Sequence, residues 1–356
     1  MASYRNVPVL ITGGLGFIGS NLAIRLVEQG AEVTVVDASV PGCGANEYNL
    51  APVRDRVRVI PLDIAEAKTF AHAIRAARVI FNLAGEISHI HSMDFPERDL
   101  QINTVAQLRF LIECQTSNPG VRVVYASTRQ IYGVPGYLPV DEHHPIQPVD
   151  YNGVHKYVTS MYHMMLARAG AIDAVVLRLT NVYGPRMALD IPCQGFLSTF
   201  LRRLLLGRPL EVFGDGMQVR DPVYVDDAVD AFLAAGSLTP HPRTTERVYN
   251  IGGAERLTLN EIASIASEAA GLCVPVHRPF PERIKAIDIG SYYTDSSLAG
   301  RELDWHARID FASGIRRTLE YCRREMTHYL DPAHPDPACK MPEHAGLERR
   351  LKYAEL

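Results

Sequence analysis

Three spaced glycines near the start of the chain are suited to phosphate binding. They lie in the segment TGGLGFIGS (12–20), after an apolar run (7–11) typical of a buried parallel strand and before apolar residues at helical spacing. In a strand-to-helix turn, Gly13 permits the tight turn, Gly16 lets a pyrophosphate approach the backbone, and Gly19 lets the helix pack closely on the strand. Because the helix N-terminus also offers unpaired N–H groups, the pattern predicts a site for the phosphates of a dinucleotide.

An acidic residue follows the glycines at the distance expected for a ribose contact. The segment AEVTVVD (31–37) indicates a second buried strand that ends in Asp37. A carboxylate there would bind the 2′-OH of an adenosine ribose and repel a 2′-phosphate, so NAD is favoured over NADP. A third strand (56–64) ends with Asp63 and Ile64, where Asp63 would lie beside the adenine amino group or act as an ordinary loop acid.

Strands and helices continue to alternate as far as residue 180, which predicts the α/β class with a Rossmann-type doubly wound parallel sheet. The remaining strands are expected at 79–85, 121–128 and 171–179, which makes six parallel strands. The helices are expected at 66–76, 99–117 and 152–169.

From residue 181 the pattern breaks into short pieces interrupted by Pro and Gly. We therefore predict an NAD-binding domain at 1–180 and a smaller substrate-binding domain at 181–330. A capped helix and a short strand within about 222–253 are expected to return to the first domain. The Pro/His-rich stretch at 331–356 indicates a C-terminal tail.

Composition excludes several other classes of protein. The chain has 356 residues, 47% of them hydrophobic and 21% charged, and a net charge of −4 without a long basic run, which argues against a nucleic-acid surface. Six cysteines without paired spacing suit reduced thiols better than disulfides or zinc, and no apolar stretch is long enough to span a membrane, so we expect a soluble cytoplasmic protein. His89 and His91, like His143 and His144, lack a supporting carboxylate cluster, so no metal is expected.

Taken together, the motifs resemble the extended short-chain dehydrogenase/reductases, within the group of nucleotide-sugar epimerases, dehydratases and decarboxylases. The resemblance covers about residues 6–325. It rests on motifs that occur in the family's order: TGGLGFIGS, Asp37, Asp63-Ile64, NLAG (82–85), ASTRQIYG (126–133), Lys156, RLTNVYGPR (178–186), GDGMQVRD (214–221) and YVDDAVDAF (224–232).

This resemblance implies roles for particular residues. Around NAD it implies Gly13, Gly16, Phe17, Ile18, Asp37, Asp63, Ile64, Leu83, Ala84, Gly85, Asn103 and Lys156. Thr128 would hydrogen-bond the sugar near its reacting carbon, and Lys156 would hold the nicotinamide ribose and lower a neighbouring pKa. Around a nucleotide-diphospho-sugar it implies Glu86, Thr128, Arg129, Asn181, Arg186, Arg220, Lys285, Asp288 and Tyr292, with Arg220 gripping the diphosphate.

The sequence departs from the family pattern at two places. Where the family's dehydratases carry an Asp-Glu pair, this chain has Arg129-Gln130, which cannot shuttle a proton at neutral pH, so 4,6-dehydration is not expected. Four residues before Lys156, where the family carries its tyrosine base, stands Asn152, and the nearest tyrosine, Tyr151, is one residue early. Two hypotheses follow: Tyr151 swings inward as the base, or, as we favour, Asn152 holds a water through which Thr128 relays the proton.

The expected activity is NAD-dependent epimerisation of a nucleotide sugar through transient oxidation at C4. The alternatives are a lyase similar to UDP-glucuronate decarboxylase, indicated by Gly184-Pro185-Arg186-Met187, and a non-catalytic protein that binds NAD or a sugar nucleotide. A homodimer is expected through the helices at 99–117 and 152–169, because the second carries more apolar surface than one core-facing stripe needs.

Overall fold

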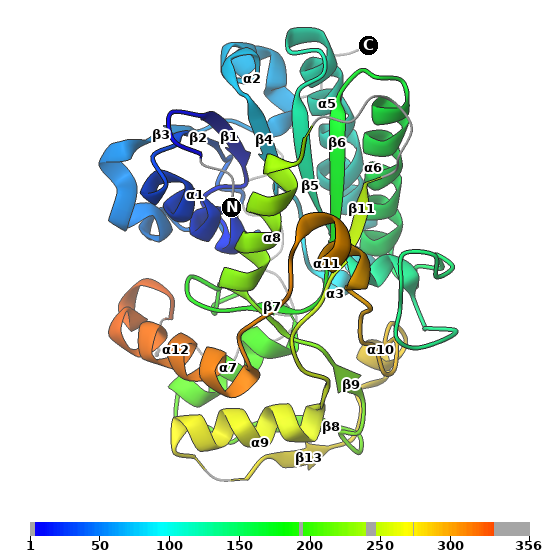
Figure 1. The fold of residues 1–356 in the computed structure, drawn as a ribbon. Coiled ribbons are helices and arrows are strands. Elements are labelled where there is room, and N and C mark those ends of the chain that lie inside the picture. The colour runs from blue at the N-terminus through cyan, green and yellow to red at the C-terminus, as the bar shows by residue number, and fades with distance from the viewer. Residues whose placement is uncertain (1–3, 192–194, 240–246, 273, 331–356) are drawn as a thin grey trace.

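The computed structural model describes residues 4–191, 195–239, 247–272 and 274–330, so the predicted tail at 331–356 lies outside the described residues. Its centre is a sheet of seven parallel strands in the order β11-β6-β5-β4-β1-β2-β3 (Figure 1). The strands are β1 Pro8–Thr12, β2 Glu32–Val36, β3 Val57–Ile60, β4 Val79–Asn82, β5 Arg122–Thr128, β6 Asp173–Leu179 and β11 Val248–Ile251. This order is the doubly wound arrangement, and the predicted Rossmann-type fold is confirmed.

Helices cover both faces of this sheet, because alternate residues of each buried strand point to opposite sides. On one face, Ile11 and Val35 pack in a core that also contains side chains of α1 (Phe17–Glu28) and α8 (Val225–Ser237). On the other face, Leu10 packs with side chains of α2 (Ala71–Ala76), α5 (Ala106–Ser117) and α6 (Tyr151–Arg168). Strand β11 and helix α8, which come late in the chain, thus belong to the sheet layer.

Two predicted helices are more irregular than their sequence periodicity indicated. The helix expected at 99–117 begins earlier, as α4 (Pro96–Leu100), and makes one π-helical stretch (Gln101–Val105) before α5. The helix expected at 66–76 is a 3₁₀ segment (Ile64–Phe70) capped by Asp63, followed by α2. A π-helical turn frequently marks a functional site, and this one contains Asn103.

The remaining elements gather mainly beyond the carboxyl ends of the strands, in the lower half of Figure 1. Three short strand pairs form there: β7–β10 and β8–β13 are parallel, and β9–β12 is antiparallel. The strands are β7 Val182–Tyr183, β8 Glu211–Phe213, β9 Val219–Arg220, β10 Val223–Tyr224, β12 Leu257–Thr258 and β13 Val276–Arg278. The helices are α7 Phe196–Leu205, α9 Leu259–Ala270, α10 Glu282–Lys285, α11 Ser297–Leu303 and α12 Phe311–Arg324, and α3 (His89–Asp94) follows β4.

Candidate active site

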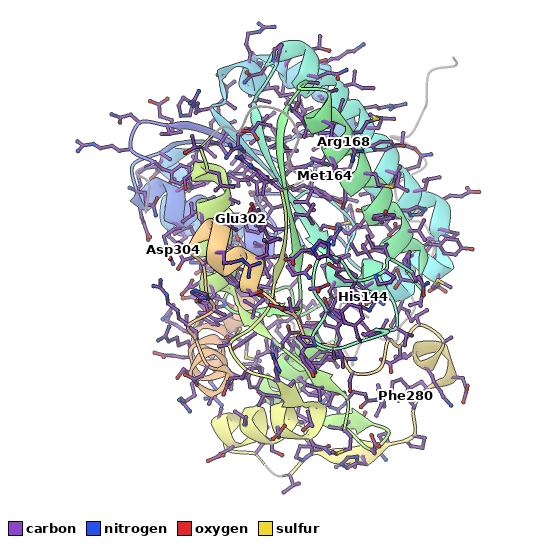
Figure 2. All side chains as sticks on the ribbon, turned by 45° about the vertical axis from the view of Figure 1, so that its right-hand side comes forward. His144, Met164, Arg168, Phe280, Glu302 and Asp304 are labelled. Atoms are coloured by element: carbon purple, nitrogen blue, oxygen red, sulfur yellow. The ribbon has the colours of Figure 1, made fainter. Side chains whose placement is uncertain are left out.

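A cavity of about 860 Å³ lies where the carboxyl ends of the central strands meet the C-terminal elements. The residues that line it include Gly13, Asp37, Thr128, Lys156 and Arg220. They also include Phe213 and Phe280, whose rings are 6.0 Å apart; Figure 2 labels Phe280 in the lower part of the molecule. In an open α/β sheet this crevice is the usual place for a ligand.

The glycine-rich turn has the geometry that a pyrophosphate needs. Gly13 has a φ of +70°, and a Cβ there would lie 2.8 Å from the carbonyl oxygen of Leu83. A Cβ on Gly19 would lie only 2.2 Å from the carbonyl oxygen of Gly13, so only glycine lets α1 start this close to β1. Helix α1 therefore presents its N-terminal N–H groups at the cavity without side chains in the way.

The two predicted acidic residues lie at the same end of the cavity. The carboxylate of Asp37 accepts hydrogen bonds from the N–H groups of Leu15 (3.0 Å) and Ser39 (2.9 Å), while burial raises the pKa of this carboxyl. Asp63 accepts from the N–H of Ala65 (2.8 Å) and so caps the following 3₁₀ segment. Both residues line the cavity, where their remaining lone pairs are available to a ligand.

The structure brings together all but one of the predicted cofactor residues. The ones that line the cavity are Gly13, Gly16, Phe17, Ile18, Asp37, Asp63, Ile64, Leu83, Ala84, Gly85 and Lys156. Asn103, which the resemblance placed around NAD, is not among the residues that line the cavity. Its side chain is buried and bonds both the N–H and the carbonyl of Glu86 (3.1 Å each), so it fixes the loop after β4.

Thr128 and Lys156 both line the cavity. Thr128 ends β5 and its hydroxyl oxygen accepts from the N–H of Gln130 (3.2 Å), which leaves its O–H free to donate. Lys156, on α6, is only 8% exposed. Burial lowers the pKa of its ammonium group, against the opposing effect of the Asp99 and Glu86 carboxylates.

Tyr151 and Asn152 point in different directions at the start of α6. Tyr151 is 45% exposed, does not line the cavity, and stacks on the ring of His155 at 6.3 Å, so the hypothesis that it swings inward has no support in this geometry. The Nδ2 of Asn152 donates to the carbonyl of Glu86 (3.0 Å) and to Asp99 (2.8 Å). Its Oδ1 is buried in the cavity wall without a hydrogen-bond partner, so it can accept a bond from a water or ligand.

Two arginines, Arg129 and Arg220, also line the cavity. Arg129 donates to Oδ1 of Asn181 (3.2 Å) and lies 5.0 Å from the ring centre of Tyr292, while its Nη1 is buried without a partner. Arg220 donates to the carbonyl of Gly290 and to Asp288 (3.4 Å). Burial, together with the nearby Arg129, lowers the pKa of Arg220 to about 10. Two buried cations that repel each other provide a site at which an anionic group is favoured.

Of the substrate residues that the resemblance implied, Thr128, Arg129, Asn181, Arg220 and Asp288 line the cavity, and four others do not. Arg186 has a φ of +72°, and its guanidinium turns away to bond Asn21 (2.9 Å) and the carbonyl of Asn49 (3.2 Å). Lys285 is exposed on the short helix α10, and Tyr292 is buried behind Arg129. Glu86 is buried and lies 3.4 Å from Arg98.

One further pair of residues at the cavity was not predicted from the sequence. His89, at the start of α3, lines the cavity, and its Nδ1 lies 3.1 Å from the buried carboxylate of Asp150. The two are far apart in sequence, and only the absence of a tyrosine at position 152 indicated that another proton acceptor was needed. Within the described ranges no group of three or more His, Cys, Asp or Glu could hold a metal ion, and no helix is long and apolar enough to cross a membrane.

The chain belongs to the NAD-dependent epimerase/dehydratase family, whose family model matches residues 9–252. A UDP-glucose 4-epimerase of Mycolicibacterium smegmatis is 32% identical over 320 residues, which cover 89% of this chain and 98% of that protein. A UDP-N-acetyl-alpha-D-glucosaminuronate decarboxylase of Bacillus cytotoxicus is 27% identical over 325 residues, which cover 88% of this chain and 97% of that protein. The crystal structure of a Thermotoga maritima UDP-glucose 4-epimerase with UDP-glucose has a TM-score of 0.80 and 30% identity, covering 89% of this chain and 99% of that one.

Similar solved structures hold NAD, among them a dTDP-glucose 4,6-dehydratase of Streptomyces venezuelae. The protein is thus an NAD-dependent enzyme of the nucleotide-sugar epimerase/dehydratase family. The predicted family and cofactor are confirmed. The residues of the cavity fit this cofactor, since the glycine turn can take the pyrophosphate and Asp37 the adenosine ribose.

Proposed function

We propose that this enzyme epimerises a nucleotide-diphospho-sugar through transient oxidation of the sugar at C4. The observation that carries the proposal is that three sets of groups line one cavity. They are the dinucleotide turn, Thr128 with Lys156, and the guanidinium groups of Arg129 and Arg220. A diphosphate bound to the arginines would leave the sugar beside Thr128, opposite the cofactor.

In this proposal the bound NAD accepts a hydride from C4 and later returns it. Thr128 donates or accepts at the sugar hydroxyl through its free O–H. The ammonium of Lys156, which burial destabilises, favours the developing negative charge on the sugar oxygen. The unpartnered Oδ1 of Asn152 holds a water in the place where the family carries a phenol.

A decarboxylase is the second candidate, because relatives of this chain at 26–28% identity are named as decarboxylases of UDP-linked sugar acids. A 4-keto intermediate is compatible with both epimerisation and decarboxylation, since a ketone at C4 also makes loss of a C6 carboxylate easier. Arg186 belongs to the segment that indicated a decarboxylase from the sequence, but its side chain lies outside the cavity and bonds Asn21. The next residue, Met187, lines the cavity. Position 186 therefore gives the decarboxylase no support.

The test is turnover of UDP-glucose, UDP-N-acetylglucosamine and UDP-glucuronic acid with NAD, followed by NMR and mass spectrometry. Epimerisation leaves the mass unchanged and inverts a stereocentre, whereas decarboxylation loses CO₂. An Arg220→Gln variant should raise KM by about 10- to 150-fold, the equivalent of about 1.5–3 kcal/mol for a hydrogen bond to a charged group. Arg278→Gln, at an exposed arginine of β13, is the matched control.

No product with any of these nucleotide sugars, and no transient absorbance at the NADH wavelength, would contradict the proposal. It would favour the remaining alternative from the sequence, a protein that binds NAD or a sugar nucleotide without turning it over.

We also infer that the protein forms a homodimer through α5 and α6. These helices carry exposed apolar side chains on one side: Ile112 of α5 and Val154, Met161 and Met165 of α6 are 40–50% exposed. Such a row on neighbouring helices favours burial against a second copy over contact with water.

A further inference from the structure

We propose that His89, oriented by Asp150, is the acid–base residue that takes the place of the missing tyrosine. This inference rests on the proposed function, because it concerns the proton that leaves the sugar hydroxyl when C4 is oxidised. It names a catalytic residue, His89, and a positioning residue, Asp150.

The first argument is that position 152, where the family carries its tyrosine, holds no acid or base in this chain. Asn152 occupies it, and an amide neither accepts nor releases a proton near neutral pH. Tyr151 is turned outward onto His155. The Thr128 hydroxyl can relay a proton but is not itself a base near neutral pH, so another group must accept the proton.

The second argument is the chemistry of the cavity wall. Among its described lining residues, His89 is the only histidine. The other carboxylates in the wall have different surroundings: Asp37 and Asp63 belong to the dinucleotide site, Asp288 is paired with Arg220, and Glu211 is paired with Arg203 and Arg278. His89 instead belongs to the loop and short helix after β4, and it is joined through Asp150 to Gln130, two residues beyond Thr128.

The third argument is the orientation of the imidazole. Nδ1 of His89 is buried beside Asp150, whereas the side chain as a whole is 31% exposed and lines the cavity, so the edge that carries Nε2 faces the cavity. The 3.1 Å distance between Nδ1 and the carboxylate is within ion-pair range, although Nδ1 makes no hydrogen bond of good geometry. Catalytic contacts of this kind often align only when substrate binds.

Asp150 is itself held rigidly. Its side chain is fully buried, and its carboxylate accepts from the N–H of Gly153 (2.6 Å) and from Nε2 of Gln130 (2.9 Å). Burial raises the pKa of Asp150, but the His89 ring and these two donors outweigh it, so the pKa lies below its ordinary value. A fixed carboxylate on Nδ1 selects the tautomer with a free Nε2 and stabilises the imidazolium once it forms.

The proton and electrons balance as follows. The C4–H bond breaks and its electron pair leaves as a hydride to NAD, while the O–H bond of the C4 hydroxyl breaks and its proton passes to Nε2 of His89. The C4=O bond forms in the sugar. In the return direction the hydride and the proton go back to C4 and its oxygen, and His89 is neutral again.

The charged groups around His89 define the expected pH dependence. Asp150 at the start of α6 faces the ring directly, and Arg129, after β5, interacts electrostatically with Asp150. Asp99 of α4 and Lys156 of α6 lie around Asn152, since Asp99 bonds its amide. Because the proton acceptor must be neutral, kcat of the wild type should fall on the acidic side of its pH profile.

The experiment measures kcat and KM for UDP-glucose against pH, together with binding of NAD and UDP-glucose by calorimetry. His89→Gln should lose about 10²- to 10⁴-fold in kcat, with both ligands still bound, and should lose the acidic limb of the pH profile. His143→Gln, at an exposed loop histidine, is the control and should behave as wild type. Added imidazole should restore part of the activity of His89→Ala, which a purely structural role would not allow.

Asp150→Asn separates positioning from helix capping, because Asn is as good an N-cap as Asp and can still accept from Gly153. It should lower kcat and move the acidic limb to lower pH, since the imidazolium loses its stabilising charge. If wild type turns over UDP-glucose while His89→Gln matches His143→Gln, the acid–base role is refuted and the proposed function stands. If wild type turns over no nucleotide sugar, the proposed function and the acid–base role fail together.

Discussion

The substitution Asp37→Asn tests the cofactor end of the cavity most directly. The carboxylate of Asp37 already accepts from Leu15 and Ser39, and its remaining lone pairs would accept from the adenosine ribose. Replacing a charged acceptor by a neutral one costs about 1.5–3 kcal/mol per lost charge-assisted bond. The Kd for NAD should therefore rise by about 10- to 150-fold.

The same substitution should affect folding only slightly. An amide has one oxygen, so one of the two backbone donors loses its partner at a cost of about 0.5–1.5 kcal/mol. Against this, burial raises the pKa of Asp37, which means that the folded protein disfavours its charge, and a neutral amide removes that penalty. The free energy of unfolding in urea should change by less than about 1.5 kcal/mol.

Calorimetry with NAD, NADP and UDP-glucose completes the assay. Discrimination against NADP should weaken, because the charge that repels a 2′-phosphate is gone. The Kd for UDP-glucose should not change, since Arg129 and Arg220, which would bind its diphosphate, are not part of the proposed ribose contact. Asp55→Asn, at an exposed aspartate, is the control. An unchanged Kd for NAD would refute the ribose contact, and an equal loss of UDP-glucose binding would refute the separation of the two sites.

Three further predictions concern other parts of the chain. Thr128→Val should lose roughly 10²-fold in kcat, whereas the kcat of Tyr151→Phe should stay within about tenfold of wild type because the Tyr151 ring is exposed. Initial rates of both variants test this. A larger loss of kcat in Tyr151→Phe than in Thr128→Val would support Tyr151 as the base. Burial lowers the pKa of His163 to about 4 from an ordinary 6.5, so the unfolded chain binds a proton that the folded chain excludes. The free energy of unfolding should therefore fall by about 1.4 kcal/mol per pH unit as the pH drops from 6.5 to 4. Urea titrations of His163→Gln should lack this contribution. An equal pH dependence of the free energy of unfolding in wild type and variant would count against the prediction. Light scattering at micromolar concentration should show a dimer that Met161→Lys with Met165→Lys dissociates, and a monomeric wild type would exclude the proposed interface.

Much of the cofactor half of the site could be predicted from the sequence because several of its residues directly follow a strand. Strand ends in a parallel sheet meet at one edge, so Gly13 after β1, Asp37 after β2 and Leu83 after β4 share a cavity once the strands are recognised. The position of the Asn103 side chain has a local reason: Asn103 lies in a π-helical stretch, and its amide bonds the backbone of Glu86 in the segment after β4.

The substrate half depended on details that periodicity does not contain. Arg186 lies in a left-handed backbone conformation that turns its side chain toward α1, and no pattern in its neighbours predicts that sign of φ. Lys285 lies on a helix of four residues, too short for a hydrophobic face to fix its orientation. The pairing of His89 with Asp150 joins two loops whose approach only the folded sheet determines.

Asn152 and the pair of His89 with Asp150 belong to one structural arrangement. The segment after β4 and the start of α6 are joined by two neighbouring contacts: the Asn152 amide bonds the carbonyl of Glu86, and the Asp150 carboxylate faces His89 three residues further on. A phenol at position 152 has no amide N–H for the first contact, so a tyrosine there would remove the bond that helps hold the loop carrying His89. The absence of a tyrosine at position 152 and the presence of His89 are therefore structurally linked. Asn152→Tyr would disturb His89, the proposed proton acceptor, while introducing a phenol as a second proton acceptor.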